Sequence, residues 1–145
     1  MQLFDWFDHH FVVRVGVSLL CGCIVGFERE WRGKPTGMRT CVLICLGTAL
    51  FVRLGAVMSA FSDKGDASRV LGQVVTGIGF LGAGVIMSRG DAIVGVTTAT
   101  VVWILAATGA LIGAGKFSEA IAIAFVTVAV LTVLDYVERI IQRLR

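Results

Sequence analysis

The sequence predicts an all-α membrane protein, a compact bundle of about five transmembrane helices with a glycine-rich central helix. Three observations lead to this prediction. The chain of 145 residues is 57% hydrophobic and only 16% charged, whereas a soluble domain carries about 25% charged residues. Its charged residues divide it into apolar segments long enough to cross a bilayer. One of these segments, Val70–Met87, is far richer in glycine than a helix in water tolerates.

Five apolar segments lie between the charged residues. They are Val15–Phe27 (extendable back to Phe11 across Arg14), Thr40–Phe61, Val70–Met87, Ile93–Ile112 and Ala120–Leu134. A spanning helix needs about 17–25 residues, so the second, third and fourth segments qualify directly. The first and fifth qualify if Arg14, Glu119 and Asp135 lie at the interfaces, where long side chains can reach water. The connections are too short for a soluble domain, so residues 1–145 are predicted to form a single domain.

The glycine-rich segment is predicted to organise the bundle. In lipid, small residues allow helix backbones to approach closely, which offsets the low helix propensity of glycine. On a helical wheel, two smooth faces flank a bulky ridge of Val74, Ile78, Leu81 and Val85, which is expected to face lipid or a third helix. The smooth faces are expected to pack on two neighbours through Gly72, Gly77, Gly79, Gly82 and Gly84. The small residues of the fourth segment, Ala106–Ala110 and Gly113–Gly115, are the expected partner surface.

The same segment contains a G-x-G-x-x-G match from Gly77 to Gly82. In dinucleotide-binding folds that motif follows a strand and precedes an acidic residue by about 20 positions, and residues 101–103 here are Val-Val-Trp. No nucleotide or other cofactor is therefore expected. The chain also lacks a nucleophile beside a histidine and paired carboxylates in a plausible cleft, so no enzyme activity is expected. Glu28 and Glu30 could bind Mg²⁺ weakly, but salt bridges to the flanking arginines are the favoured interpretation. A nucleic-acid partner is not expected either.

The basic residues predict an orientation. The connection Glu28–Arg39 holds four of the thirteen basic residues. Placing it on the same side as Arg89 and the C-terminal tail gives that side eight basic residues against four on the other. The positive-inside rule then predicts an outside N-terminus and a cytoplasmic C-terminus.

Three polar side chains fall inside predicted spans: Arg53, Gln73 and Thr76. An arginine at a helix centre costs roughly 2.5–3.5 kcal/mol. Arg53 lies about two turns from the outer end of its segment, and this short route to water favours snorkelling. The alternative is that Arg53, Gln73 and Thr76 lie near a path for an ion or a solute.

The four cysteines raise the question of a metal site. Cys21 and Cys23 close the first segment, and Cys41 and Cys45 open the second. A zinc site of four cysteines needs all of them to turn inward, but Cys21 and Cys23 point to nearly opposite helix faces. They are interpreted as small packing residues, and no metal site is expected.

The C-terminal tail is expected to be helical. Val137, Ile140, Ile141 and Leu144 keep helical spacing between charged residues. The last helix is therefore expected to continue as an amphipathic helix along an anionic membrane surface.

A polar cluster is predicted at the cytoplasmic ends of three helices. Its members are Glu28, Glu30, Arg39, Thr40, Thr97 and Thr98. Arg39 lies in the opening turn of its helix, where the helix dipole disfavours a cation unless a carboxylate offsets it. A Glu28–Arg39 pair, with Glu30 as second candidate, is predicted to frame a pocket floored by Thr97 and Thr98. The alternative is a solvated pair worth less than about 1 kcal/mol.

Several motifs in this order closely resemble the MgtC/SapB family, from about residue 16 to 120. They are Gly26-Phe-Glu28-Arg29-Glu30, Gly37-Met38-Arg39-Thr40, Arg69, Gln73 with Gly77-Ile-Gly-Phe-Leu-Gly-Ala-Gly84-Val-Ile, and Gly95-Val96-Thr97-Thr98-Ala99 with Trp103. The resemblance implies a multi-pass protein of the bacterial inner membrane, linked to growth at low magnesium and, in pathogens, to survival inside macrophages. A regulatory role is implied, including restraint of the F-type ATP synthase. The alternative is a small transporter or channel subunit for a cation or solute.

Two departures from the family pattern qualify what the resemblance implies. Many members carry a soluble C-terminal domain of ACT-like fold, which does not follow within this sequence, so regulation through such a domain is not expected of it. The family commonly has an arginine where this sequence has Val94. The expected partners are the lipid bilayer and either further copies of the chain or another membrane complex.

Overall fold

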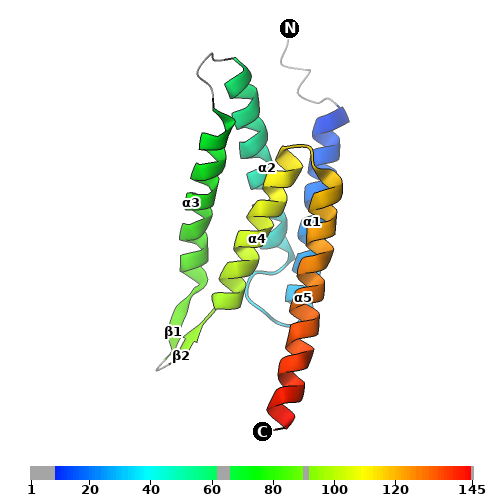
Figure 1. Ribbon diagram of the computed structural model, residues 1–145, viewed down its shortest axis with the longest axis vertical. Coiled ribbons are helices and arrows are strands. Elements are labelled where there is room, and N and C mark those ends of the chain that lie inside the picture. Colours follow the sequence, from blue (N-terminus) through cyan, green and yellow to red (C-terminus); the bar gives the residue numbers. More distant parts are fainter. Residues whose placement is uncertain (1–8, 62–65, 90–91, 145) are drawn as a thin grey trace.

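The computed structural model describes residues 9–61, 66–89 and 92–144 (Figure 1). Its helices are α1 (His9–Trp31), α2 (Met38–Ala60), α3 (Ala67–Val85), α4 (Val96–Gly113) and α5 (Phe117–Arg143). Each is long and apolar enough to cross a bilayer. The predicted class, an all-α membrane protein with five spanning helices, is confirmed.

A short antiparallel hairpin joins α3 to α4, which the sequence did not predict. Strand β1 (Met87–Arg89) pairs with β2 (Ala92–Val94). Gly95 makes the turn into α4 possible, because its φ is +93° and a Cβ there would lie 2.0 Å from the Val85 carbonyl oxygen. The helices therefore end earlier and begin later than the apolar segments Val70–Met87 and Ile93–Ile112 suggested.

The helix at the centre is α4, and not the glycine-rich α3. Half (50%) of the spanning stretch of α4 is buried, against 11% for α3. Helix α4 contacts all four other helices, and Figure 1 shows it between α3 and α5. The predicted central position of the glycine-rich helix is therefore wrong. The most deeply buried large side chains, Leu105 and Ile112, belong to α4.

Helix α3 also faces the bundle with its bulky ridge and not with its glycines. Ile78 is 8% exposed, and Val74 packs against the core. A Cβ added to Gly72, Gly77, Gly79 or Gly84 would meet nothing within 4 Å, whereas one on Gly82 would lie 3.7 Å from the Ala99 Cβ. Helix α3 therefore contacts α2 and α4 through large side chains, and a cavity of about 590 Å³ remains between α2 and α3.

The backbone-close contacts lie between α2 and its two main neighbours. A Cβ on Gly22 or Gly26 of α1 would lie 2.5 Å from a Cα atom of α2. A Cβ on Gly109 of α4 would lie 2.5 Å from the Cys45 carbonyl oxygen, and one on Gly113 2.7 Å from that of Ala49. The small residues of α4 thus pack against α2, whereas they were expected to pack against α3. This is the use of small residues that membrane helices favour.

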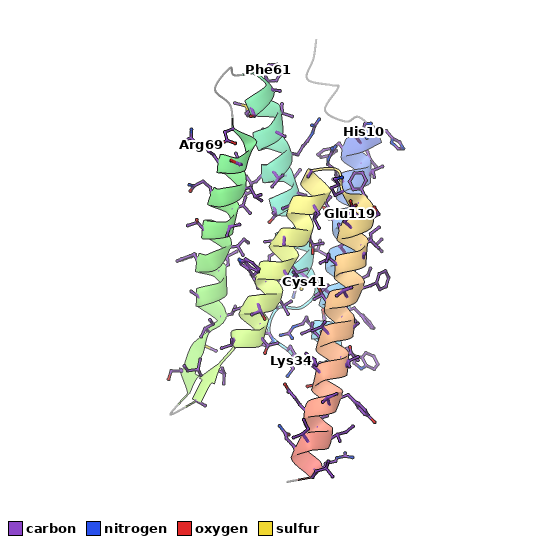
Figure 2. All side chains as sticks on the ribbon, in the orientation of Figure 1. His10, Lys34, Cys41, Phe61, Arg69 and Glu119 are labelled. Atoms are coloured by element: carbon purple, nitrogen blue, oxygen red, sulfur yellow. The ribbon has the colours of Figure 1, made fainter. Side chains whose placement is uncertain are left out.

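The connections gather at two ends of the bundle. The α1–α2 connection, the β1–β2 hairpin and the C-terminal part of α5 lie at one end, which we call the hairpin end (Figure 1). Figure 2 shows His10, Phe61, Arg69 and Glu119 toward the opposite end. This agrees with the predicted grouping of the charged first connection, the third loop and the tail. Helix α5 continues to Arg143 as expected, and its placement along a membrane surface stays a prediction.

Candidate functional site

Two ionisable side chains are buried at the hairpin end. Arg29 is 2% exposed and Glu28 is 8% exposed. Both lie in the last turns of α1, where Gly26 lets the backbone of α2 come close enough to cover them. The Arg29 Nη2 atom donates a 2.7 Å hydrogen bond to Oγ1 of Thr98. Arg29 therefore ties the end of α1 to the first turn of the central helix α4.

A second set of charges ties α1 to α5. The Nε atom of Arg32 lies 2.8 Å from Oε1 of Glu28, one helical turn earlier. The Nη1 atom of Arg32 donates to Oδ2 of Asp135 on α5. Asp135 also accepts from Arg139 at 2.9 Å. Glu28, Arg32, Asp135 and Arg139 thus form a continuous chain of alternating charge, which we call the charge chain.

The buried end of this network has unused hydrogen-bonding capacity. Within the described residues, Oε2 of Glu28 and Nε of Arg29 are buried and have no hydrogen-bond partner. Buried polar atoms are normally paired with protein or with ordered water. One free acceptor and one free donor on neighbouring residues could hold water or a small polar group. Breaking the Glu28–Arg32 ion pair would be costly, because the remaining buried charge would be left uncompensated.

The structure brings only part of the predicted polar cluster together. Thr98 accepts from Arg29, the sequence neighbour of Glu28, while the Glu28 carboxylate itself pairs with Arg32. Glu30 accepts a 3.2 Å hydrogen bond from the backbone N–H of Met38 and so caps α2. Arg39, Thr40 and Thr97 are exposed. Thr97 and Thr98 do not form a common floor, since only Thr98 is buried.

The predicted Glu28–Arg39 pair is wrong in its partner. Glu28 pairs with Arg32, which lies four residues further on the same helix and reaches it without any loop closing. Arg39 forms no ion pair among the residues that the structure describes, and the carboxylate at the start of α2 comes from Glu30 instead. Glu30, the second candidate, thus lies at this helix start, but its contact is a hydrogen bond from the Met38 N–H and not an ion pair with Arg39.

Four functional candidates escaped the sequence reasoning: Arg29, Arg32, Asp135 and Arg139. The spacing of four between Glu28 and Arg32, and between Asp135 and Arg139, is a visible signal for ion pairs on a helix. The Arg32–Asp135 contact joins residues that are 103 positions apart. No local pattern reports such a contact.

The predicted intramembrane polar residues lie on α2 and α3. Gln73 lines a cavity of about 590 Å³ between these helices, together with Thr40, Thr48 and apolar side chains. Thr76 donates a 3.0 Å hydrogen bond to the Gly72 carbonyl oxygen. Arg53 is exposed on the surface of α2.

The cysteines fill space in the interior. Cys21, Cys41 and Cys45 are fully buried, and Cys23 is exposed. The Cys45 thiol donates to the Leu105 carbonyl oxygen at 3.5 Å, across the α2–α4 contact. Among the residues that the structure describes, no three or more His, Cys, Asp and Glu side chains are grouped to hold a metal ion.

Five spanning helices with a buried charge network at one end define a multi-pass membrane protein. Residues 15–140 match the MgtC family, so the chain belongs to the MgtC family, as its motifs suggested. No solved structure matches it.

Relatives from three bacteria show the extent of the similarity. The chain is 43% identical over 129 residues to the "Putative magnesium transporter YhiD" of Escherichia coli K12, covering 85% of this chain and 60% of YhiD. It is 38% identical over 113 residues to protein MgtC of Salmonella typhimurium LT2, covering 77% of this chain and 47% of MgtC. It is 40% identical over 110 residues to the uncharacterized protein slr0014 of Synechocystis, covering 76% of this chain and 46% of slr0014. The chain therefore spans about half the length of the curated relatives that it matches.

Proposed function

We propose that the chain is a regulatory protein of the bacterial inner membrane, linked to magnesium homeostasis and adaptation to low magnesium. It acts through contacts with another membrane protein or with further copies of itself, and is neither an enzyme nor an ion carrier on its own. The name of YhiD, with its reference to magnesium transport, supports the link to magnesium. The resemblance to the MgtC/SapB family supports a role in virulence and the F-type ATP synthase as a candidate partner complex.

One observation favours regulation over transport by the single chain. Among the described residues, every carboxylate lies outside the apolar spanning stretches or at their borders. These carboxylates are Glu28, Glu30, Asp66, Glu119, Asp135 and Glu138. The middle of the bundle is filled by side chains such as Leu105, Cys45 and Ala106. Mg²⁺ keeps an octahedral shell of oxygen ligands, and this interior offers it no carboxylate oxygens.

The open face of α3 is the proposed contact surface. Gly72, Gly77, Gly79 and Gly84 have free space around them, and Phe80 among them is 81% exposed. Small residues allow close helix association in lipid, where burial of apolar area alone gives little driving force. A partner helix could therefore use the glycines that the chain itself leaves unused. Gly82 is excluded from this surface because it faces α4.

The cavity between α2 and α3 favours the second candidate, a small transporter or channel subunit for a cation or solute. Gln73 and Thr48 line this cavity, while Arg53 and Thr76 lie on the same two helices. A path for an ion or solute through this cavity would need α3 to move, or a further copy of the chain to close its open side.

Reconstitution distinguishes the two candidates. The purified chain, in liposomes loaded with a magnesium-sensitive dye, is expected to give no Mg²⁺ influx above that of empty liposomes. Influx that is lost in Gln73→Leu would contradict the regulatory proposal and support transport.

Photo-crosslinking tests the contact surface directly. A photoreactive amino acid at Gly79, which lies outside the lining of the α2–α3 cavity, is expected to capture a membrane protein or a second copy in living cells. The same group at Phe125, which is 58% exposed on α5, serves as the control. Equal capture at both positions, or none at Gly79, would contradict the proposed role of the α3 face.

The orientation remains part of the proposal. The excess of basic residues at the hairpin end supports a cytoplasmic location of that end and an outside N-terminus. A reporter fused after Arg145 is expected to read as cytoplasmic, and one inserted at Gly65 as external. Opposite signals would invert the arrangement.

A further inference from the structure

We propose that a basic pocket at the hairpin end binds the headgroup of an anionic phospholipid. The pocket has a volume of about 460 Å³ and lies between the end of α1 and the last turns of α5. It is lined by Trp31, Arg32, Lys34, Thr132, Asp135, Tyr136 and Arg139. Its volume falls in the range of sites that hold small ligands.

The charge of the lining favours an anion. Three cations, Arg32, Lys34 and Arg139, line the pocket beside one carboxylate, Asp135, and Arg32 also pairs with Glu28 outside the lining. Asp135 is already engaged by both arginines. Lys34 forms no ion pair within the described part of the chain, and Figure 2 shows it beside α5 near this end. A phosphodiester would supply the negative charge that the pocket lacks.

The position of the pocket along α5 places it at the level of a membrane interface. The stretch of α5 from Phe117 to Asp135 is about 27 Å long at 1.5 Å per residue. This matches the hydrocarbon thickness of a bilayer, about 30 Å. The pocket begins where this apolar stretch ends, and basic pockets at this level recognise lipid headgroups.

The aromatic residues of the pocket fit the same location. Trp31 is 81% exposed and Tyr136 is 66% exposed. Exposed Trp and Tyr side chains collect at the headgroup level, where one part of the ring is apolar and the other is wet. The Trp31 ring lies 5.9 Å from that of Phe27, one turn closer to the bilayer centre.

Apolar surface continues from the pocket toward the middle of the bundle. On α1, Phe27 and Leu20 are exposed along the stripe that contains Trp31. On α5, Phe125 is exposed along the stripe that contains Thr132 and Tyr136. A phospholipid would place its acyl chains along these stripes, whereas a soluble phosphate compound would leave them without a role.

Native mass spectrometry of the detergent-solubilised chain tests this proposal. Phosphatidylglycerol and phosphatidylcholine are added in parallel, and the variant Lys34→Gln/Arg139→Gln is compared with the control Lys116→Gln/Arg69→Gln. Both variants lose two positive charges, but the control loses them at the opposite end. The original chain and the control are expected to retain phosphatidylglycerol preferentially. In the pocket variant, the ratio of retained phosphatidylglycerol to retained phosphatidylcholine is expected to fall by about 25-fold. Each of the two basic residues removed contributes a factor of about five to the binding of an anionic lipid.

Three results would overturn the proposal. The first is equal retention of the two lipids by the original chain. The second is an equal loss of preference in both variants, which would indicate general charge attraction. The third is displacement of phosphatidylglycerol by millimolar inorganic phosphate or ATP, which would assign the pocket to a soluble phosphate compound. Circular dichroism of both variants checks that the helices are intact.

Discussion

Arg29 on α1 and Thr98 on α4 share a buried 2.7 Å hydrogen bond across 69 residues of sequence. The guanidinium has no room to turn toward water, so its charge depends on Thr98 and on the neighbouring Glu28. The hydroxyl of one threonine therefore holds the hairpin end of the central helix against α1.

Replacing Thr98 by valine is expected to destabilise the protein by about 1.5–3 kcal/mol, because a buried charged donor loses its acceptor. The thermal unfolding midpoint in detergent measures the effect. Thr98→Ser is expected to retain most of the stability, since it keeps the hydroxyl. Thr97→Val is the matched control, because Thr97 is exposed on the same turn. Equal midpoints for Thr98→Val and Thr97→Val would contradict the importance of the hydrogen bond.

Replacing Asp135 by asparagine is expected to loosen α5 from α1, because Arg32 and Arg139 lose their shared carboxylate. The pair is partly exposed, so the expected loss of stability is less than about 1 kcal/mol. Salt should reduce the difference between the original chain and the variant, since it screens the pairs. Unfolding midpoints in low and high NaCl measure this. Glu138→Gln is the control, as Glu138 has no ion pair in the described part of the chain, and a matching effect there would refute the charge chain.

Adding a methyl group separates the glycines that pack from those that do not. Gly109→Ala places a Cβ 2.5 Å from the Cys45 carbonyl oxygen and is expected to cost about 1–3 kcal/mol through overpacking. Gly77→Ala meets nothing within 4 Å and is expected to leave the stability of the single chain unchanged or slightly higher, because alanine favours helix. Unfolding midpoints and yields in detergent test both variants. The reverse order of stability would show that α3, and not α4, makes the close contact.

The start of α3 is expected to respond to acid. Hydrogen bonds from the hydroxyl and the backbone N–H of Ser68 lower the pKa of Asp66 below its ordinary value. A lowered pKa in the folded state means that the cap stabilises the helix above the ordinary pKa of about 4. The stabilisation is lost as the pH falls through the lower, folded value. An NMR titration of the Ser68 amide should follow this loss, and Asp66→Asn should remove the dependence. A Ser68 amide signal that moves equally in Asp66→Asn would disprove the assignment.

The spans and the family could be read from the sequence because both depend on local patterns. Charged residues mark the limits of apolar segments, and the motif around Glu28 and the glycines of α3 is contiguous. The position of α3 could not be read in the same way. Glycine spacing shows that a face is smooth, but the same smooth face suits an internal neighbour, a second chain or lipid. Gly109 and Gly113 pack closely and Gly77 and Gly84 do not, but the sequence around the two sets does not distinguish them.

The candidate site was predicted in part for a related reason. Glu28 and Thr98 were found because each lies at a helix end near polar neighbours. Salt bridges between Glu28 and the flanking arginines were expected, but the specific pairing with Arg32 was not, since the dipole argument gave weight to Arg39. Asp135 entered the prediction only as the border of a span. Its contact with Arg32 depends on the packing angle of α5 against α1, which no local pattern encodes.

The close fit of Gly22 and Gly26 against α2 also bears on how the chain is made. Helices α1 and α2 are consecutive, so this pair can associate as soon as the second helix leaves the translocon. The central helix α4 arrives only after α3 has been synthesised, and it must then enter the side of α2 that carries the Cys45 and Ala49 carbonyl groups. The glycines of α4 therefore allow a late helix to take the innermost place, and α3 is left at the rim with its own glycines uncovered.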